Sequence, residues 1–158
     1  MRALFVLMTL TGLACASAHA SLGGAPSDFG PTAARARQLA GAVPGAIPGA
    51  SPANAPAPFT ITETTLDSGT VVREYVGPGG TVFGVSWNGP FLPDLRTLLG
   101  ERFADLKAAA GDKSRGRGQM QVNQGDLVIE SNGHMRAWSG RAWLNSALPA
   151  GVAAEVVQ

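Results

Sequence analysis

Residues 59–87 read FTITETTLDSGTVVREYVGPGGTVFGVSW, and the architecture follows from the pattern of this segment. β-branched and aromatic residues alternate with polar ones in three runs. Asp67-Ser68-Gly69 and Gly77-Pro78-Gly79-Gly80, both typical turn sequences, separate these runs. Alternating runs between turn signals are typical of antiparallel strands, so the segment predicts a three-stranded meander.

The first turn also predicts how the first two strands are paired. A three-residue loop with Gly69 in the left-handed conformation places Glu63 opposite Arg73 and Ile61 opposite Tyr75. A two-residue loop would instead place two glutamates opposite each other, and like charges in directly opposite positions are destabilising. The register that pairs Glu63 with Arg73 is therefore expected.

A helical pattern follows the meander. Apolar residues recur at intervals of three and four from Leu92 to Leu106, and Pro93 and Asp94 are typical of a helix start. The pattern predicts one amphipathic helix whose apolar stripe covers the sheet. Gly100 lies in the middle of this helix and weakens it by up to about 1 kcal/mol.

A second hairpin is predicted near the C-terminus. Asn132-Gly133 is a strong turn signal, and it joins residues 126–131 to residues 134–144. This turn places Leu127 opposite Trp138 on the expected buried face. Residues 120–122 are expected to add one more short strand.

These elements predict an α+β fold, in which a small antiparallel sheet, made of the three-stranded meander and the second hairpin, is packed by one amphipathic helix. The folded domain is expected at residues 59–152, followed by a C-terminal tail at 153–158. Residues 21–58 are expected to form a disordered, Ala/Pro/Gly-rich N-terminal arm with a short helix at 31–40.

The first twenty residues have the pattern of a secretory signal peptide. An apolar run at 3–16 follows Arg2 and precedes the small-x-small triplet Ala18-His19-Ala20. As a helix this run would span about 21 Å, which is shorter than the roughly 30 Å of a bilayer core. We expect cleavage near Ala20 and a periplasmic or secreted protein, with no transmembrane segment in the mature chain.

A competing hypothesis treats Cys15 as the lipid-bearing cysteine of an outer-membrane lipoprotein, which would make the protein a lipid-anchored structural component of the envelope. The preceding Gly12-Leu13-Ala14 lacks the branched aliphatic residue usual three positions upstream of such a cysteine. Cleavage near Ala20 is therefore favoured over lipidation.

Composition excludes several kinds of chemistry. The chain has 158 residues, enough for one domain, and a formal net charge of +1, so no strong field indicates a nucleic-acid partner. After cleavage no cysteine remains and His134 is the single histidine, so thiol chemistry and a structural zinc site are excluded. No metal site and no cofactor is predicted.

Candidate site residues lie on the second hairpin. Trp143 and Arg141, near the end of the last strand, are expected to be exposed and to bind a ligand; Arg136 and His134 are the further candidates. The competing hypothesis is a small hydrolase that uses His134 with Ser131 or with a carboxylate. Asp126 and Glu130 would stand about 13 Å apart on a strand, too far for a glycosidase pair.

Several short segments resemble a known bacterial family, the domain of unknown function 2844. They are Ser21-Leu22-Gly23-Gly24, Val72-Arg73-Glu74-Tyr75, Val85-Ser86-Trp87-Asn88-Gly89-Pro90, Pro93-Asp94-Leu95, Gly133-His134-Met135-Arg136-Ala137 and Gly140-Arg141-Ala142. The resemblance spans most of the mature chain. It implies a small exported protein of Gram-negative bacteria and assigns no activity, cofactor or catalytic residue. We therefore expect a non-catalytic envelope-associated binding or accessory module, with an envelope component or a small ligand as its partner.

Overall fold

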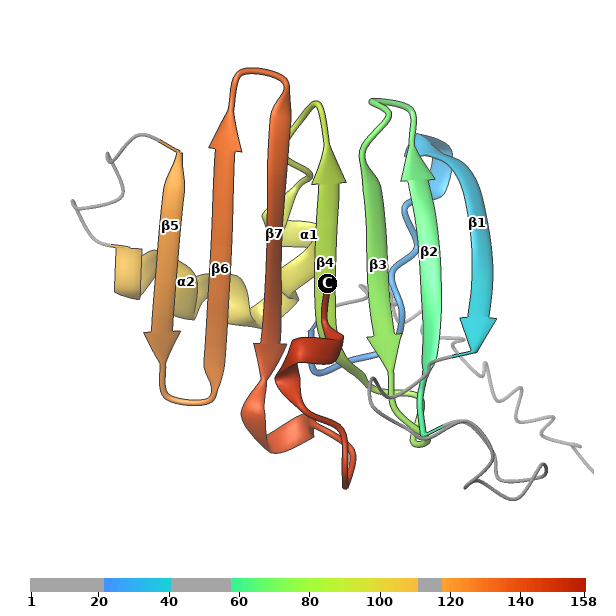
Figure 1. Cartoon of the computed structure of the whole chain (residues 1–158), viewed down its shortest axis with the longest axis vertical. Coiled ribbons are helices and arrows are strands. Elements are labelled where there is room, and N and C mark those ends of the chain that lie inside the picture. The colour runs from blue at the N-terminus through green and yellow to red at the C-terminus, as the bar shows by residue number, and fades with distance from the viewer. Residues whose placement is uncertain (1–21, 41–57, 111–117) are drawn as a thin grey trace, which may run out of the picture.

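Seven antiparallel strands form one continuous sheet in the computed structural model, which describes residues 22–40, 58–110 and 118–158 (Figure 1). The expected signal peptide, Cys15 and most of the proline-rich linker lie outside these residues. The spatial order of the strands is β1-β2-β3-β4-β7-β6-β5. Their bounds are β1 Ala33–Ala40, β2 Thr60–Leu66, β3 Val71–Val76, β4 Val82–Gly89, β5 Gln119–Gln124, β6 Leu127–His134 and β7 Ala137–Leu144.

The predicted division into a three-stranded meander and a separate hairpin is wrong, because β4 pairs with β7 and joins the two into a single sheet. β4 is the central strand, and its residues 82–87 are buried. Trp87 lies opposite Gly140, where a Cβ would come within 2.3 Å of the indole ring. Because Gly140 has no side chain, the Trp87 ring can lie over β7 on the face that the helices cover. The glycine therefore allows the two halves of the sheet to pair at this position.

The predicted short helix at 31–40 is also wrong. A 3-10 turn at Gly30–Thr32 leads into β1, which pairs along β2 and places Arg37 opposite Glu63. A short isolated helix is marginal in water. Pairing with an available sheet edge, together with an ion pair to Glu63, outweighs the helix propensity of these residues.

The predicted register of the first hairpin is confirmed. Glu63 lies opposite Arg73, and Ile61 lies opposite Tyr75. Gly69 has φ of 82°, the left-handed conformation that the three-residue loop requires.

The second hairpin turns three residues later than predicted. His134 pairs with Ala137, so the turn lies at Met135-Arg136, and Leu127 is opposite Leu144 rather than Trp138. Gly133 lies within β6, where a Cβ would come within 2.1 Å of the Trp138 ring. Packing of this ring on the glycine overrides the local Asn-Gly turn signal.

One face of the sheet is covered by helices, which lie behind it in Figure 1. They are α1 Leu95–Leu99, a 3-10 turn at Gly100–Arg102 and α2 Phe103–Ala110. The single predicted helix is thus interrupted at Gly100, whose φ of 52° is not helical. Leu99 and Leu106, which belong to the predicted stripe, are buried against the sheet, and so is Leu98, which does not belong to it. Leu92, at the start of the predicted stripe, is exposed instead.

Both ends of the described chain pack on the sheet, so residues 22–40 of the predicted disordered arm are part of the fold, and so is the predicted C-terminal tail. Leu22 is buried on the helical side, the Gly23 amide donates to the Val82 carbonyl, and the Val82 amide donates to the Gly24 carbonyl, both at 2.8 Å. On the opposite face, the C-terminal segment (residues 149–158) crosses β4 and β7 (Figure 1). Its Val156 and Val157 are buried in a second apolar cluster, whose other members include Phe59, Tyr75, Phe83 and Trp143.

Candidate binding site on the polar face of the sheet

A polar row crosses all seven strands on the face that carries the C-terminal segment. Directly opposite residues of an antiparallel sheet share a face, so the strand register defines this row. From β1 to β5 it consists of Arg37, Glu63, Arg73, Ser86, Arg141, Glu130 and Gln121.

The charges in this row are paired. Glu63 lies between two arginines, with Arg37 Nη2 at 2.7 Å and Arg73 Nε at 3.0 Å from its carboxylate oxygens. The hydrogen bond from Arg73, assisted by Arg37, lowers the pKa of Glu63 despite its burial. Arg141 donates to Oε2 of Glu130 through Nε at 2.8 Å and Nη2 at 2.7 Å. Every charged side chain in the row is therefore ion-paired, with three arginines to two glutamates.

The C-terminal segment covers the middle of the row. Arg73 Nη1 donates to the Gln158 carbonyl at 3.2 Å, and Arg141 Nη1 donates to the Val157 carbonyl at 3.4 Å. The Tyr75 hydroxyl donates to the same Gln158 oxygen and accepts from the Gln158 amide at 3.0 Å. These contacts fix the segment over β3, β4 and β7 and leave the polar face of β6 and β5 uncovered by it.

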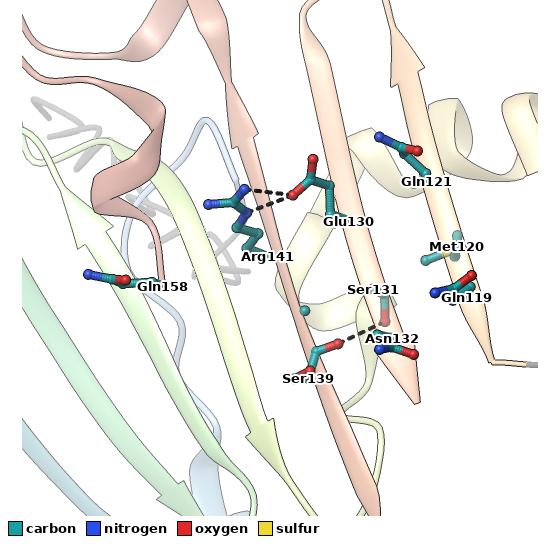
Figure 2. A pocket seen from close by; sticks show the side chains of 10 residues that line it. Gln119, Met120, Gln121, Glu130, Ser131, Asn132, Ser139, Arg141 and Gln158 are labelled. Atoms are coloured by element: carbon teal, nitrogen blue, oxygen red, sulfur yellow. Dashed lines mark hydrogen bonds and ion pairs between the residues drawn. The ribbon is translucent and has the colours of Figure 1, made fainter. Parts of the chain in front are cut away.

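A hollow of about 650 Å³ lies beside the end of this segment, over β7, β6 and β5. Figure 2 shows amide and hydroxyl side chains around the Arg141–Glu130 pair. The polar residues that line the hollow are Gln119, Gln121, Glu130, Ser131, Asn132, Ser139, Arg141 and Gln158. Amides both donate and accept hydrogen bonds, and Arg141 and Glu130 compensate each other's charge, so the hollow fits a neutral, polar ligand.

Of the four residues predicted to bind a ligand, Arg141 lines this hollow. Trp143 does not, because the C-terminal segment and the Arg141 side chain cover it and leave only 7% of its surface exposed. The Arg141 guanidinium lies 5.1 Å from the indole centroid, and the indole Nε1 donates to Asn145 Oδ1 at 3.0 Å. The expectation of an exposed Trp143 is therefore wrong, and its ring lies beneath the Arg141 guanidinium.

His134 and Arg136 lie at the far end of the same hairpin. They line a separate hollow of about 420 Å³ that also includes Asn88 and Trp138. Arg136 is exposed in the turn, with φ of 61°. The predicted ligand-binding residues therefore do not form one site, because Arg141 lines the first hollow and His134 and Arg136 line the second.

The structure does not assemble the nucleophile and base of the hydrolase hypothesis. Ser131 and His134 are three residues apart on β6, so their side chains point to opposite faces. The Ser131 hydroxyl donates instead to the Ser139 carbonyl at 3.3 Å.

The two carboxylates of the hairpin are also engaged elsewhere. Asp126 accepts hydrogen bonds from the Ser146 amide at 2.7 Å and from its hydroxyl at 2.6 Å, and these bonds lower the pKa of Asp126. Glu130 is paired with Arg141. Neither carboxylate is placed to orient His134.

The amide residues of β5 were missed from the sequence, where only residues 120–122 were expected to form a strand. The alternation of Gln119, Gln121 and Asn123 with Met120 and Val122 was the available signal. Within the described ranges, no group of three or more histidine, cysteine or acidic residues is placed to hold a metal ion. None of the helices described is long and apolar enough to cross a bilayer.

The fold and the hollow define a class of protein: a seven-stranded antiparallel sheet with helices on one face and an open polar hollow on the other. The chain belongs to the family described as Protein of unknown function (DUF2844), whose model matches residues 18–157. This match confirms the resemblance to the family that the short sequence segments indicate. No curated protein and no solved structure matches the chain.

Proposed function

We propose that the protein is an exported, non-catalytic binding module of the bacterial envelope, and that its hollow over β5, β6 and β7 holds a neutral oligosaccharide rich in hydroxyl and acetamido groups. The observation that carries this proposal is the set of amide and hydroxyl side chains around a compensated Arg141–Glu130 pair. The apolar run and Ala18-His19-Ala20 at the N-terminus support export, so envelope glycans are the candidate ligands.

The electrostatics favour a neutral ligand over an anion. A phosphate or carboxylate site needs an arginine whose charge is available, but Arg141 already donates two hydrogen bonds to Glu130. The remaining groups, Gln119, Gln121 and Asn132, each offer an acceptor and two donors. Sugar hydroxyls and acetamido groups match this mixture of donors and acceptors.

The shape favours a segment of a polymer over an enclosed small molecule. The hollow lies on a sheet face rather than between layers, and the C-terminal segment borders it on one side only (Figure 2). Binding then depends on hydrogen bonds to several consecutive sugar units, and we expect a modest affinity per unit.

Calorimetric titration with a tetrasaccharide of β-1,4-linked N-acetylglucosamine tests the proposal. Arg141→Met keeps an aliphatic chain over Trp143 and removes the guanidinium, so we expect the dissociation constant to rise about tenfold, as for loss of a charged hydrogen bond. His134→Ala, in the other hollow, is the matched control and should bind as the wild type does. Absence of binding by the wild type, or equal loss in both variants, would contradict the proposal.

The same titration distinguishes binding from hydrolysis. A binding module leaves the tetrasaccharide intact after prolonged incubation, which mass spectrometry of the recovered sugar measures. Cleavage that His134→Ala abolishes would instead support the hydrolase hypothesis and overturn the non-catalytic assignment.

A further inference from the structure

Each end of the sheet has an edge that no other strand of the described chain pairs with: the outer edge of β1 and the outer edge of β5. An unpaired edge presents backbone N–H and C=O groups that can pair with another chain. Natural proteins block such pairing with charged side chains, prolines, bulges or a covering element. The two edges of this sheet differ in these protections.

β1 is protected. It carries Arg35 and Arg37, and its pairing with β2 is irregular between Ala33 and Arg35. β5 reads Gln-Met-Gln-Val-Asn-Gln from Gln119 to Gln124, with no charged residue, no proline and an unbroken register along β6. Among the residues that the structure describes, the β5 edge therefore lacks the charged side chains and the bulge that protect β1.

We propose that β5 is a dimerisation edge, where β5 of a second copy of the chain pairs antiparallel and continues the sheet across a twofold axis. Opposite residues in such a pair must lie on the same face, so the axis passes through a residue and not between two. With Gln121 on the axis, Gln119 is opposite Asn123 and Met120 is opposite Val122. Every pair then matches an amide with an amide or an apolar side chain with an apolar one.

Other registers match the strand less well. An axis through Val122 places the apolar side chain of Met120 opposite the amide side chain of Gln124. The axis through Gln121 also extends the existing layers, because Val122 is buried and Met120 is half-buried on the helical side of the sheet. The strand sequence is thus complementary to itself in one register.

The pairing has a consequence for the hollow. Gln119 and Gln121 line it from β5, so the hollows of two copies would meet at the axis and form one longer polar surface. This consequence rests on the proposed function; the dimer itself does not. A six-residue edge is a small interface, so we expect a weak, concentration-dependent dimer.

Sedimentation equilibrium of the purified full chain over a dilution series tests the proposal, with a reversible monomer–dimer equilibrium as the expected result. Gln121→Lys and Gln121→Glu each place like charges opposite each other at the axis, so each should raise the dimer dissociation constant about fivefold. Mixing the two variants places opposite charges there and should restore dimerisation. Gln38→Lys, an exposed glutamine on β1, is the matched control and should leave the equilibrium unchanged.

The mixing step separates a lost interface from a damaged strand, because a misfolded variant is not rescued by the opposite charge. A wild type that stays monomeric at every concentration overturns the proposal. So does a dimer that Gln38→Lys dissociates while both Gln121 variants keep it, or a mixture that stays monomeric. If the protein does not bind the tetrasaccharide, the dimer proposal is unaffected, because the sedimentation experiment is done without the sugar.

Discussion

A Cβ atom on Gly84 would lie 2.6 Å from Cγ2 of Val157, closer than the two carbons can approach. The central strand therefore has a glycine where the C-terminal segment crosses it. Val157 is completely buried at this contact. The fit explains why residues 153–158 pack on the sheet, although the sequence predicts a folded domain that ends at residue 152.

The contact between Gly84 and Val157 gives the first prediction. Gly84→Ala should force the Val157 side chain to move and lower the free energy of unfolding by about 1–3 kcal/mol, the range for overpacking a core. Val157→Ala removes two methyl groups and should also destabilise, but the double variant should lose less than the sum of the two single changes. Urea denaturation of the four proteins measures this coupling. Strict additivity would show that the two residues do not touch.

Trp143 gives the second prediction, and it is a prediction about stability. Trp143→Ala should cost about 3–5 kcal/mol because a buried indole is removed, whereas Trp143→Phe loses mainly the hydrogen bond to Asn145, about 1 kcal/mol. Met135→Ala serves as the control, since Met135 is 97% exposed in the turn. Equal denaturation midpoints for Trp143→Ala and wild type would contradict the buried position.

Glu74 gives a prediction for pH dependence. It is 1% exposed, and both of its carboxylate oxygens accept from the Ser27 amide at 3.0 Å. Burial raises the pKa of Glu74 above its ordinary value, and the bonds from Ser27 offset only part of the rise. The folded protein therefore binds more protons than the unfolded chain between the two pKa values, so this contribution to stability falls as pH rises through that window.

Glu74→Gln should remove this decline. Relative to wild type, its free energy of unfolding should increase as pH rises from below the ordinary glutamate pKa, about 4.3, toward neutral. Glu63→Gln is the control with the opposite sign, because the arginines lower the pKa of Glu63 and its stabilisation is lost as pH falls. Denaturation curves at several pH values measure both. A Glu74→Gln curve that runs parallel to wild type would contradict the raised pKa.

The N-terminus gives the fourth prediction. If the protein is exported as proposed, intact mass spectrometry of protein recovered from the periplasm or medium should show a chain that begins at Ser21, because the apolar run and Ala18-His19-Ala20 match the pattern of a cleaved signal peptide. A mass that retains residues 1–20 would contradict export by this route. A chain that begins at a lipid-modified Cys15 would support the lipoprotein hypothesis instead.

The sequence predicts contacts that depend on neighbouring residues better than contacts between distant ones. The register that pairs Glu63 with Arg73 can be predicted from the length of a single loop, and the structure confirms it. The pairing of β4 with β7 depends on the packing of Trp87 on Gly140. These two residues are more than fifty positions apart, so no local sequence pattern predicts the pairing. Likewise, the Asn132-Gly133 signal fails because Trp138 packs on Gly133 within the paired strands.

The candidate site shows the same limit. Arg141 was selected for its place near an aromatic residue on a strand, and it does line the hollow. Trp143 is predicted to be exposed because it lies near the end of the last strand, but its burial depends on the C-terminal segment, whose docking involves Gly84, Arg73 and Tyr75. The amides of β5 become a site only once β5 lies beside β6.

Backbone amide chemical-shift mapping during titration with the N-acetylglucosamine tetrasaccharide tests the central claim most directly, because it locates the ligand on the sheet. The account predicts that the shifts concentrate at Gln119, Gln121, Asn132, Ser139 and Arg141, with the sugar recovered intact. Shifts confined to the hairpin end around His134 and Arg136, or none at saturating sugar, would contradict it.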